Sequence, residues 1–525
     1  MHRILISDPL HPSGIEALGA NGAEVRLLAP EEKSRLAEIL PDYDALVVRS
    51  GTQVTAELLD AGKNLRVVGR AGIGVDNVDV AAATERGILV VNAPTANMMS
   101  ATEHTFALLL ALARNVASAD AVMKKGVWDR KSFVGMELQG KTIGLVGFGR
   151  IGQRVARRAR GFEMRVLAYD PYLEPAVAER EGVELLSLDE LLSQVDVVSL
   201  HTPLTEATRN ILSGDRLRQL KKGAVVVNCG RGGTLDEDTL LELLNDGHIR
   251  GAALDVFTNE PPESFDLILH PKVVATPHIG AQTQEAQLRI AADTAEMVLK
   301  ALDGSLEVTA VNLPFRSTGS RPSPFLPLGE QLGRLASALL DGALHRAKVD
   351  FWGVEEELHH SVGVAVLKGA LTHSIGAGVN YVNAGHLANS RAIDVERSVH
   401  SSHRVFDRCL KVTLESSDGK VVEVEGTVFG EDDARVVSFR GYQLEFKPEG
   451  RLLVIVNRDV PGVVGRIGTV LGDAGINITH IHLARRRGED TAIAAVRLDR
   501  LPDAETRERL LGLDDILEAV SVDLS

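Results

Sequence analysis

Cysteine is scarce in this chain, where Cys229 and Cys409 are the only two among 525 residues. Two thiols are too few for a disulfide framework or a cysteine-rich metal site, so a reducing compartment is the simplest setting. Basic residues are also in the minority, with 57 Lys and Arg against 72 Asp and Glu and a net charge of -15. This balance disfavours non-specific nucleic-acid binding, and an anionic ligand would need a local basic pocket.

Long hydrophobic runs are missing as well. No stretch approaches the roughly 18 apolar residues of a spanning helix, and the apolar run within MHRILISDPL is too short for a signal peptide. We therefore expect a cytoplasmic protein with no membrane partner, no nucleic-acid partner and no bound metal. The 44% of hydrophobic residues are enough to build a core, and 525 residues predict three or four domains.

The N-terminal region alternates short β-branched runs with helical stretches, which predicts an α/β unit with a parallel sheet. Strands are expected at residues 3–7, 45–48 and 65–68, and a helix at 30–40. Residues 102–114, TEHTFALLLALAR, are apolar nearly all round. That pattern is typical of a helix buried between domains or subunits.

Six apolar runs recur between residues 141 and 277, namely TIGLV, RVLAY, VDVVSL, AVVVN, GAALD and KVVAT. Six strands with helical segments between them predict a doubly wound sheet. A helix follows at 284–302, and the turn-rich STGSRPSPFLP predicts a linker near residues 314–325. Beyond it, an α+β region extends to about residue 447 before RLLVIVNRD begins a compact unit.

A glycine-rich turn, Gly147, Gly149 and Gly152, follows the strand expected at 142–146 and leads into the helical QRVARRAR. Such a turn lets the backbone approach a pyrophosphate, whose charge then faces the start of the helix. Asp170 ends the next strand, 18 residues after Gly152. Since a carboxylate there accepts ribose hydroxyls and repels a 2′-phosphate, the pattern predicts NAD rather than NADP.

Three chemically capable side chains follow later strands of this sheet, where ligands of parallel sheets bind. They are Arg231, Glu260 and His278. His278 is the candidate acid/base for an alcohol proton, with Glu260 orienting its imidazole and Arg231 gripping a substrate carboxylate. Taken singly, each has a plainer interpretation: a surface or core histidine, an arginine capping a turn, a solvated glutamate. Their joint placement favours the catalytic interpretation.

The runs GRAGIGVDNVD, GFGRIG, NCGRGG, ALDVFTNEPP and TPHIGAQT resemble the D-isomer-specific 2-hydroxyacid dehydrogenases over about residues 1–313. The resemblance implies that Arg231, Glu260 and His278 are catalytic. It also implies NAD contacts, beyond the three glycines, from Ile73, Arg150, Ile151, Asp170, Thr202, Cys229, Gly230, Arg231, Asp255, His278, Gly280 and Ala281.

Within that family, the chain is similar to the long branch that oxidises D-3-phosphoglycerate. Arg49, Ser50 and Gly51 follow one N-terminal strand and Arg70 follows the next, a set able to hold a phosphate. The resemblance adds Asn97 as a substrate contact and Arg130 as part of a segment reaching a neighbouring subunit's site. For each of these arginines alone, a surface salt bridge is the alternative.

The tail from residue 452 resembles an ACT domain: a strand, a loop, a helix at 463–474 and a second strand from Ile476. ACT domains are expected to bind small amino acids at a dimer interface, and Asn457, Asp459 and Asn477 are the candidate residues for an L-serine effector. Asp459 capping the helix and Asn477 merely starting a strand are the alternatives.

Together these patterns predict an α/β protein in which a doubly wound, Rossmann-type NAD domain (98–286) is inserted in a flavodoxin-like substrate domain (1–97 and 287–313). Two α+β regulatory domains follow, an intervening domain (317–448) and an ACT domain (452–525). A homo-oligomer, dimer or tetramer, is expected. Another 2-hydroxy acid as substrate, or an NAD-sensing scaffold without turnover, remain the alternative functions.

Overall fold

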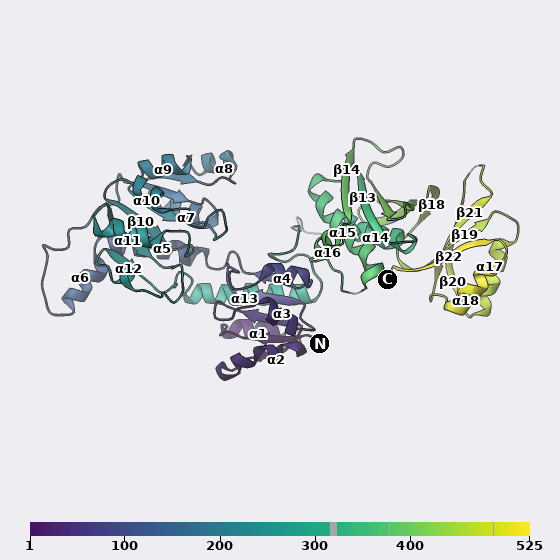
Figure 1. Cartoon of the computed structure of the whole chain (residues 1–525), viewed down its shortest axis with the longest axis horizontal. Coiled ribbons are helices and arrows are strands. Elements are labelled where there is room, and N and C mark those ends of the chain that lie inside the picture. Colours follow the sequence, from purple (N-terminus) through teal and green to yellow (C-terminus); the bar gives the residue numbers. More distant parts are fainter. Residues whose placement is uncertain (21, 316–322, 377, 487, 525) are drawn as a thin grey trace.

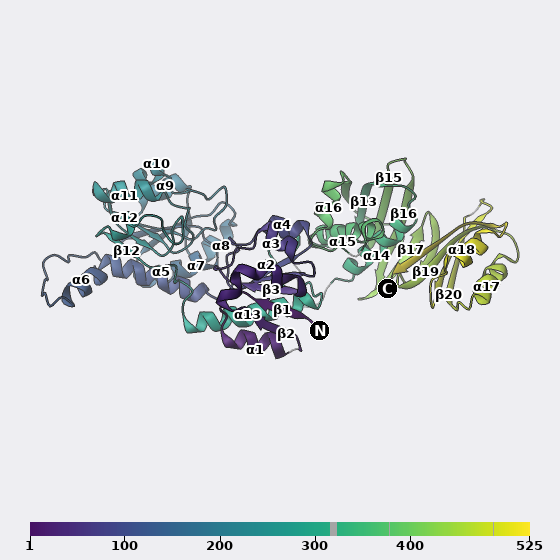
Figure 2. The ribbon, with the colours of Figure 1, turned by 60° about the horizontal axis from the view of Figure 1, so that its bottom comes forward.

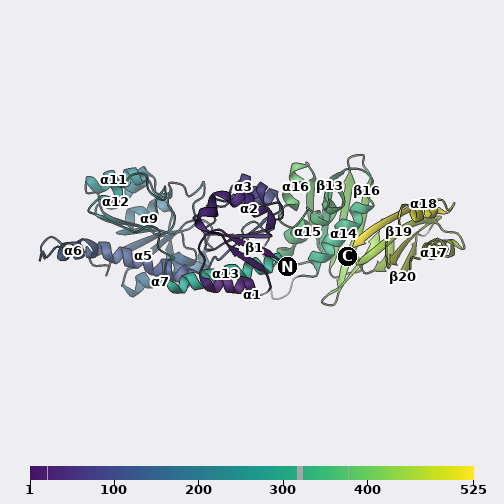
Figure 3. The ribbon, with the colours of Figure 1, turned by 90° about the horizontal axis from the view of Figure 1, so that it is seen from below.

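The computed structural model describes residues 1–20, 22–315, 323–376, 378–486 and 488–524. Four units follow one another along an elongated molecule (Figure 1). The unit with α5 to α12 lies at one end, and the N-terminal unit lies beside it. A unit with α14 to α16 comes next, and the C-terminal unit with α17 and α18 occupies the other end, an order that Figures 2 and 3 preserve.

The N-terminal unit is built on a parallel sheet with strand order β2-β1-β3-β4-β5. This is the order of flavodoxin-like folds. Its strands are β1 (Arg3–Ile6), β2 (Glu24–Leu27), β3 (Ala45–Val48), β4 (Val67–Arg70) and β5 (Leu89–Asn92). Its helices are α1 (Pro12–Ala20), α2 (Leu36–Ile39), α3 (Ala56–Ala61), α4 (Val80–Glu85) and, returning from far along the chain, α13 (Gln284–Leu302).

The helix expected at 30–40 is largely wrong. A 3-10 helix (Pro30–Arg35) stands there, followed by the single turn of α2 and a second 3-10 turn (Leu40–Asp42). Pro30 is favourable at the first helical position, but Pro41 has no backbone N–H to donate, so the segment breaks into short turns.

The second sheet is parallel with order β12-β11-β10-β9-β6-β7-β8, a doubly wound arrangement. Its strands are β6 (Thr142–Val146), β7 (Arg165–Tyr169), β8 (Glu184–Leu185), β9 (Val197–Leu200), β10 (Ala224–Asn228), β11 (Ile249–Leu254) and β12 (Val273–Ala275). The six expected strands are confirmed, whereas the two-residue β8 has no apolar run to announce it. The helices are α7 (Arg150–Gly161), α8 (Pro175–Arg180), α9 (Leu188–Gln194), α10 (Gly214–Gln219), α11 (Glu237–Asn245) and α12 (Asp266–Leu269).

Helix α5 (Met98–Ala113) joins the two sheets and continues, after a bend of 62°, into α6 (Val116–Met123). Its buried side includes Phe106, Leu108 and Leu109, while Glu103 and Ala107 are exposed, so it is not buried all round. Among the described residues, no single helix is long and apolar enough to cross a membrane, and α5 with α6 meets that test only as a bent pair, by length and composition. The cytoplasmic location stays a prediction.

The third unit has a mixed sheet with order β14-β13-β15-β16-β17-β18, in which only the β13–β14 pair is parallel. Its elements are α14 (Phe325–Ala338), β13 (Leu344–Trp352), α15 (Glu356–Ile375), α16 (Ala384–Ser390), β14 (Asp394–His400), β15 (Cys409–Ser416), β16 (Val421–Phe429), β17 (Asp433–Phe439) and β18 (Tyr442–Phe446). Most of the predicted linker, residues 316–322, lies outside the described residues.

The last unit follows the order β-α-β-β-α-β, with an antiparallel sheet ordered β20-β21-β19-β22. Its elements are β19 (Gly450–Arg458), α17 (Val463–Asp473), β20 (Ile478–Arg485), β21 (Thr491–Leu498), α18 (Ala504–Leu511) and β22 (Ile516–Leu524). One face of the sheet packs on its own helices, and the other joins the core of the third unit through Leu452, Val454 and Ile493. The α/β fold class is confirmed, and the exact domain limits stay predictions.

Candidate active site

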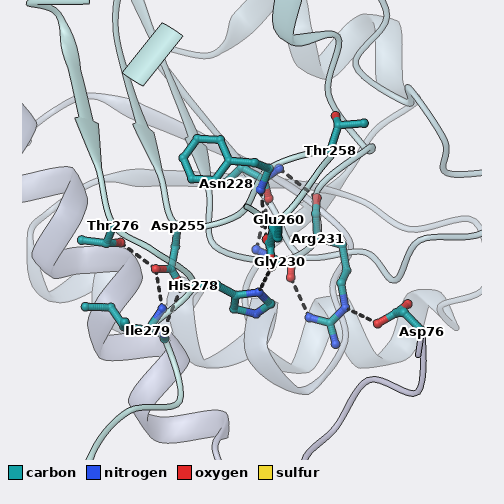
Figure 4. A network of polar contacts seen from close by, with 12 residues as sticks. Asp76, Asn228, Gly230, Arg231, Asp255, Thr258, Glu260, Thr276, His278 and Ile279 are labelled. Atoms are coloured by element: carbon teal, nitrogen blue, oxygen red, sulfur yellow. Dashed lines mark hydrogen bonds and ion pairs between the residues drawn. The ribbon is translucent and has the colours of Figure 1, made fainter. Parts of the chain in front are cut away.

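The three predicted catalytic residues follow three neighbouring strands of the second sheet. Arg231 lies after β10, Glu260 after β11 and His278 after β12, and all three carboxyl ends meet at one edge. His278 Nδ1 is 2.6 Å from Glu260 Oε2. Figure 4 shows the imidazole linked to Glu260, with the Arg231 side chain nearby. The side chains of His278 and Glu260 are 45% and 36% exposed, which leaves the pair reachable from the cleft.

Asp255 anchors the loop that carries His278. Its carboxylate is 1% exposed and accepts the backbone N–H groups of Ile279 and Gly280, each at 2.8 Å. Burial alone would raise the pKa of Asp255, but hydrogen bonds from His104, Thr276 and the Ile279 N–H outweigh it and hold that pKa below its ordinary value. The carboxylate is therefore ionised at neutral pH and can hold this loop.

Arg231 contacts the other lobe across the cleft. Its Nε lies 3.1 Å from Oδ2 of Asp76, and its Nη1 donates to the carbonyl of Gly230 at 2.7 Å. Gly74 stands where a Cβ would come within 2.0 Å of the Arg231 guanidinium. The N-terminal lobe thus supplies a close-fitting wall opposite the catalytic loops, and a salt bridge that fixes the guanidinium.

Two further arginines of the N-terminal lobe belong to this cleft. Burial lowers the pKa of Arg70 to about 10, and the positive charges of Arg231 and Arg49 act in the same direction. Burial likewise lowers the pKa of Arg49, partly offset by Asp8. Arg70 Nε is buried and has no hydrogen-bond partner within the described part of the chain. Such mutually repelling guanidinium groups form a site that an anion would stabilise.

The glycine-rich turn has the geometry that a dinucleotide needs. Gly147 has a φ of +96°, and a Cβ there would lie 2.9 Å from the carbonyl of His201, while one on Gly152 would lie 2.4 Å from the Gly147 oxygen. At Gly149, none of the described atoms lies within 4 Å of an added Cβ, so this position is open. The first and third glycines permit packing and the second leaves room for a ligand.

All but one of the other predicted cofactor residues lie at the same edge. Asp170, at the end of β7, accepts the N–H of Phe148 at 2.9 Å, and Thr202 Oγ1 is buried without a partner among the described residues. Burial raises the pKa of Cys229 to about 12, so that its thiol stays protonated. Loops at this edge also contain Gly230, Gly280 and Ala281, and α7 begins with Arg150 and Ile151, whereas Ile73 follows β4 in the N-terminal unit.

The remaining predicted substrate residues lie in three separate segments of the chain. Ser50 and Gly51 are exposed after β3, and Asn97 precedes α5 with a buried Oδ1 that no described group contacts. Arg130 is not brought to the cleft of its own chain. It is exposed in the segment after α6, which lies at the far end of the molecule (Figure 1).

The three predicted effector residues do not meet within one chain. Asp459 follows β19 and binds Arg485 at 2.9 Å, and Asn457 is 4% exposed. Asn477 precedes β20, whose first residue pairs with Leu498 opposite Arg451, at the start of β19. Because strands rise by about 3.3 Å per residue and Asp459 is eight residues beyond Arg451, Asn477 and Asp459 are roughly 26 Å apart, at opposite ends of the sheet.

Sequence reasoning missed three residues of the site. Asp76 pairs with Arg231, His104 with Asp255, and Asp8 with Lys33 at 2.7 Å beside Gly51. Asp76 lies within the run GRAGIGVDNVD and His104 within TEHTFALLLALAR, but neither pattern marks these two side chains as part of the site. Within the described ranges, no cluster of three or more His, Cys, Asp or Glu side chains is placed to hold a metal ion.

Comparison with known proteins agrees with this architecture. Residues 106–280 match the NAD-binding domain of D-isomer specific 2-hydroxyacid dehydrogenases, residues 321–440 the D-3-phosphoglycerate dehydrogenase intervening domain, and residues 451–515 the ACT domain. A D-3-phosphoglycerate dehydrogenase of Methanocaldococcus jannaschii is 41% identical, and one of Bacillus subtilis 37% identical, each across 100% of both chains. The chain belongs to the D-isomer-specific 2-hydroxyacid dehydrogenase family.

A solved structure of the family supports the cofactor. The D-lactate dehydrogenase of Aquifex aeolicus, complexed with NAD and lactic acid, covers 58% of this chain and 96% of its own, with 29% identity and a TM-score of 0.52. The open Gly149 position, the unpartnered Thr202 hydroxyl and the Asp170 carboxylate fit an NAD molecule at the corresponding edge. As a member of the 2-hydroxyacid dehydrogenases, the chain is an NAD-dependent dehydrogenase, which confirms the predicted enzyme class and cofactor.

Proposed function

We propose that the chain oxidises C2 of D-3-phosphoglycerate to 3-phosphohydroxypyruvate, the first step toward L-serine, and that L-serine inhibits it. The choice of substrate rests on the cluster of Arg49, Arg70 and Arg231 in a cleft of an otherwise acidic protein. Phosphoglycerate has a carboxylate and a phosphate, and two anions match three cations drawn from both lobes. The names of the relatives from Methanocaldococcus jannaschii and Bacillus subtilis point to the same substrate.

The proton is assigned to His278. Its Nδ1 faces the Glu260 carboxylate, which only accepts, so Nδ1 carries hydrogen and Nε2 is the nitrogen available to the substrate hydroxyl. NAD, when bound, accepts the hydride from C2. The hydroxyl proton then passes to His278 Nε2 as the C2 carbonyl forms, and Glu260 stabilises the resulting imidazolium. Arg231 holds the carboxylate and polarises the new carbonyl oxygen.

The phosphate is assigned to Arg49, Arg70 and the backbone of Ser50 and Gly51. Asn97 is proposed to contact the substrate, and Arg130 to reach the cleft of a second copy. An assembly of two or four chains is supported by exposed apolar side chains on α6 and the following segment, including Met123 (50%), Trp128 (77%) and Val134 (78%). Large exposed apolar side chains gathered in one segment are typical of surfaces that contact another chain.

The regulatory site is assigned to two ACT units. Asp459 and Asn477 are separated by the length of a strand in one chain, so a small zwitterion cannot touch both there. A second copy related by a two-fold axis along the β20 edge would bring its Asn477 to the Asp459 end. Ile481 and Leu483 on β20, 37% and 50% exposed, support such an interface.

The test of the catalytic assignment is NADH formation from D-3-phosphoglycerate by the full chain. His278→Ala should lower kcat about a hundredfold to ten-thousandfold while NADH still binds, because acid/base catalysis contributes about 10² to 10⁴. Retention of near-full turnover by this variant would remove His278 as the acid/base.

Arg70→Met should raise KM for D-3-phosphoglycerate at least about tenfold but leave KM for D-glycerate, which lacks the phosphate, within about twofold. Equal effects on both substrates would contradict the phosphate assignment.

A further inference from the structure

One helix of the inter-lobe connection contacts the loop of the predicted acid/base. His104, on α5, lies with its Nε2 3.2 Å from Asp255 Oδ1 and 2.9 Å from Thr276 Oγ1. Its side chain is 16% exposed and packs beside Gly280, where a Cβ would stand 3.9 Å from His104 Cδ2. The contact joins residues 151 positions apart in sequence.

The protonation of His104 follows from its partners. Thr276 Oγ1 donates its only hydrogen to Asp255 Oδ1 at 2.6 Å, and an ionised carboxylate has none to give. Neither partner can donate to the ring, so His104 Nε2 must carry a hydrogen and donate it. The imidazole thus acts as a fixed donor toward Asp255 and Thr276.

Asp255 transmits this contact to the catalytic loop. Oδ1 accepts His104, Thr276 and the N–H of Ile279, while Oδ2 accepts the N–H of Gly280. The two N–H bonds fix the peptide groups directly after His278, whose own N–H donates to the Asp255 carbonyl at 2.8 Å. His278 adopts a φ of +51°, a left-handed conformation that a residue with a side chain keeps only when its surroundings hold it.

The same helix face holds the far end of this loop. Ser100, one turn before His104, has its Oγ 2.7 Å from the hydroxyl of Thr283, the residue that caps α13. Arg289 on α13 donates to the carbonyl of Ala96 at 2.9 Å. Residues 93–97 and 276–283 are the two connections between the lobes. Helix α5 follows the first of them and contacts the second, which carries His278.

We propose that His104 is a positioning residue for the reaction, donating from Nε2 to the Asp255–Thr276 pair and so fixing the carboxylate that holds His278 in its catalytic orientation. The inference rests on the proposed role of His278 as acid/base. His104 itself touches neither substrate nor the reacting atoms. It acts on kcat through the placement of the imidazole, since a small misplacement of a catalytic group is enough to lower turnover.

Two conservative variants of the full chain separate this role from a structural one. The amide nitrogen of His104→Gln can reach the place of Nε2, whereas that of His104→Asn is too short and reaches only the place of Nδ1. We expect His104→Asn to lower kcat about 10- to 100-fold, with KM for the hydroxy acid and Kd for NADH within about twofold. His104→Gln should recover kcat to within about threefold of the unaltered protein. Glu103→Gln, at the exposed neighbouring position, is the control and should change nothing.

The measured kcat values distinguish a positioning role of His104 from a purely structural one. Equal kcat in the Asn and Gln variants, or a loss confined to KM, NADH affinity or melting temperature, overturns the positioning role. His278→Ala, measured beside them with the fastest hydroxy acid of a panel, tests the assignment on which it rests. An active His278→Ala overturns both the acid/base assignment and this inference, while an inactive His278→Ala with a fully active His104→Asn overturns the inference alone.

Discussion

At the scale of single residues, we predict that Asp170 favours NAD over NADP through its negative charge. Its Oδ2 accepts from Phe148 and its Oδ1 from Tyr172, at 2.9 and 3.0 Å, which leaves each oxygen a lone pair for a ribose hydroxyl. We expect Asp170→Asn to reduce the preference for NAD over NADP at least about tenfold in kcat/KM, or about 1.4 kcal/mol, because the repulsion of a 2′-phosphate is removed. Steady-state kinetics with both cofactors measure it. Glu174→Gln, exposed in the same loop, should keep the original ratio, and an unchanged ratio in Asp170→Asn would contradict the role.

His201 makes stability depend on pH at the same edge. Burial lowers the pKa of His201 to about 4 from the ordinary 6.5. The unfolded chain binds a proton below pH 6.5 that the folded chain takes up only near 4, so stability present above pH 6.5 is lost as the pH falls through this window. The loss between pH 7 and 5 should amount to about 2 kcal/mol at most, because some solvent reaches the ring.

Urea unfolding of the NAD-free protein at pH 7 and 5 checks this expectation. His201→Asn should show a smaller loss on acidification than the unaltered chain. His386→Asn, at an exposed position of α16, should behave as the unaltered chain does. The same acid sensitivity in all three proteins would show that His201 is not its source.

At the scale of elements, the glycines of the β6–α7 turn have different roles: Gly152 allows close packing, and Gly149 leaves room for the ligand. A Cβ on Gly152 would lie 2.4 Å from the Gly147 carbonyl oxygen, so Gly152→Ala should cost about 1–3 kcal/mol of stability and weaken NADH binding. Gly149→Ala meets none of the described atoms within 4 Å and should leave the melting temperature unchanged. It should still lower NADH affinity at least about tenfold, because the methyl group occupies the approach to the pyrophosphate. Calorimetry and fluorescence titration measure the two effects, and undiminished NADH binding by Gly149→Ala would refute the division.

Elements with a strong local signal are predictable from sequence, and those set by distant contacts are not. The helix expected at 284–302 has the bounds of α13, because the Thr283 side chain caps its start and an apolar stripe runs its length. The strand-end rule likewise places Arg231, Glu260 and His278 together. It gives no sign of Asp76 or His104, whose contacts with Arg231 and Asp255 span 155 and 151 residues. Asn477 and Asp459 stand at opposite ends of a sheet because of its strand order, and no motif in the sequence shows that order.

At the scale of the whole molecule, the N-terminal unit is in direct contact with the third unit, and the third unit with the ACT unit. Asn380, before α16, donates to the carbonyl of Gly87 at the end of the α4 turn, at 2.7 Å. The ACT sheet shares a core with the third unit through Leu452, Val454 and Ile493. A continuous series of packed elements therefore joins the last unit to the substrate lobe, and such a series is one route by which an effector site is coupled to a distant one.

The proposed effector site makes a prediction that only an assembly of chains can satisfy. If each site takes Asp459 from one chain and Asn477 from another, Asp459→Ala and Asn477→Ala alone should each lose L-serine binding, because every site lacks one partner. In a dimer containing one chain of each kind, one site combines both intact residues and the other lacks both. The two variants are unfolded and then refolded together to form mixed dimers. Each mixed dimer should bind L-serine at one of its two sites, with close to the original affinity. Isothermal titration of the mixture measures it, with each variant refolded alone as the control. A site formed within one chain would regain nothing on mixing, and that result would refute the shared site.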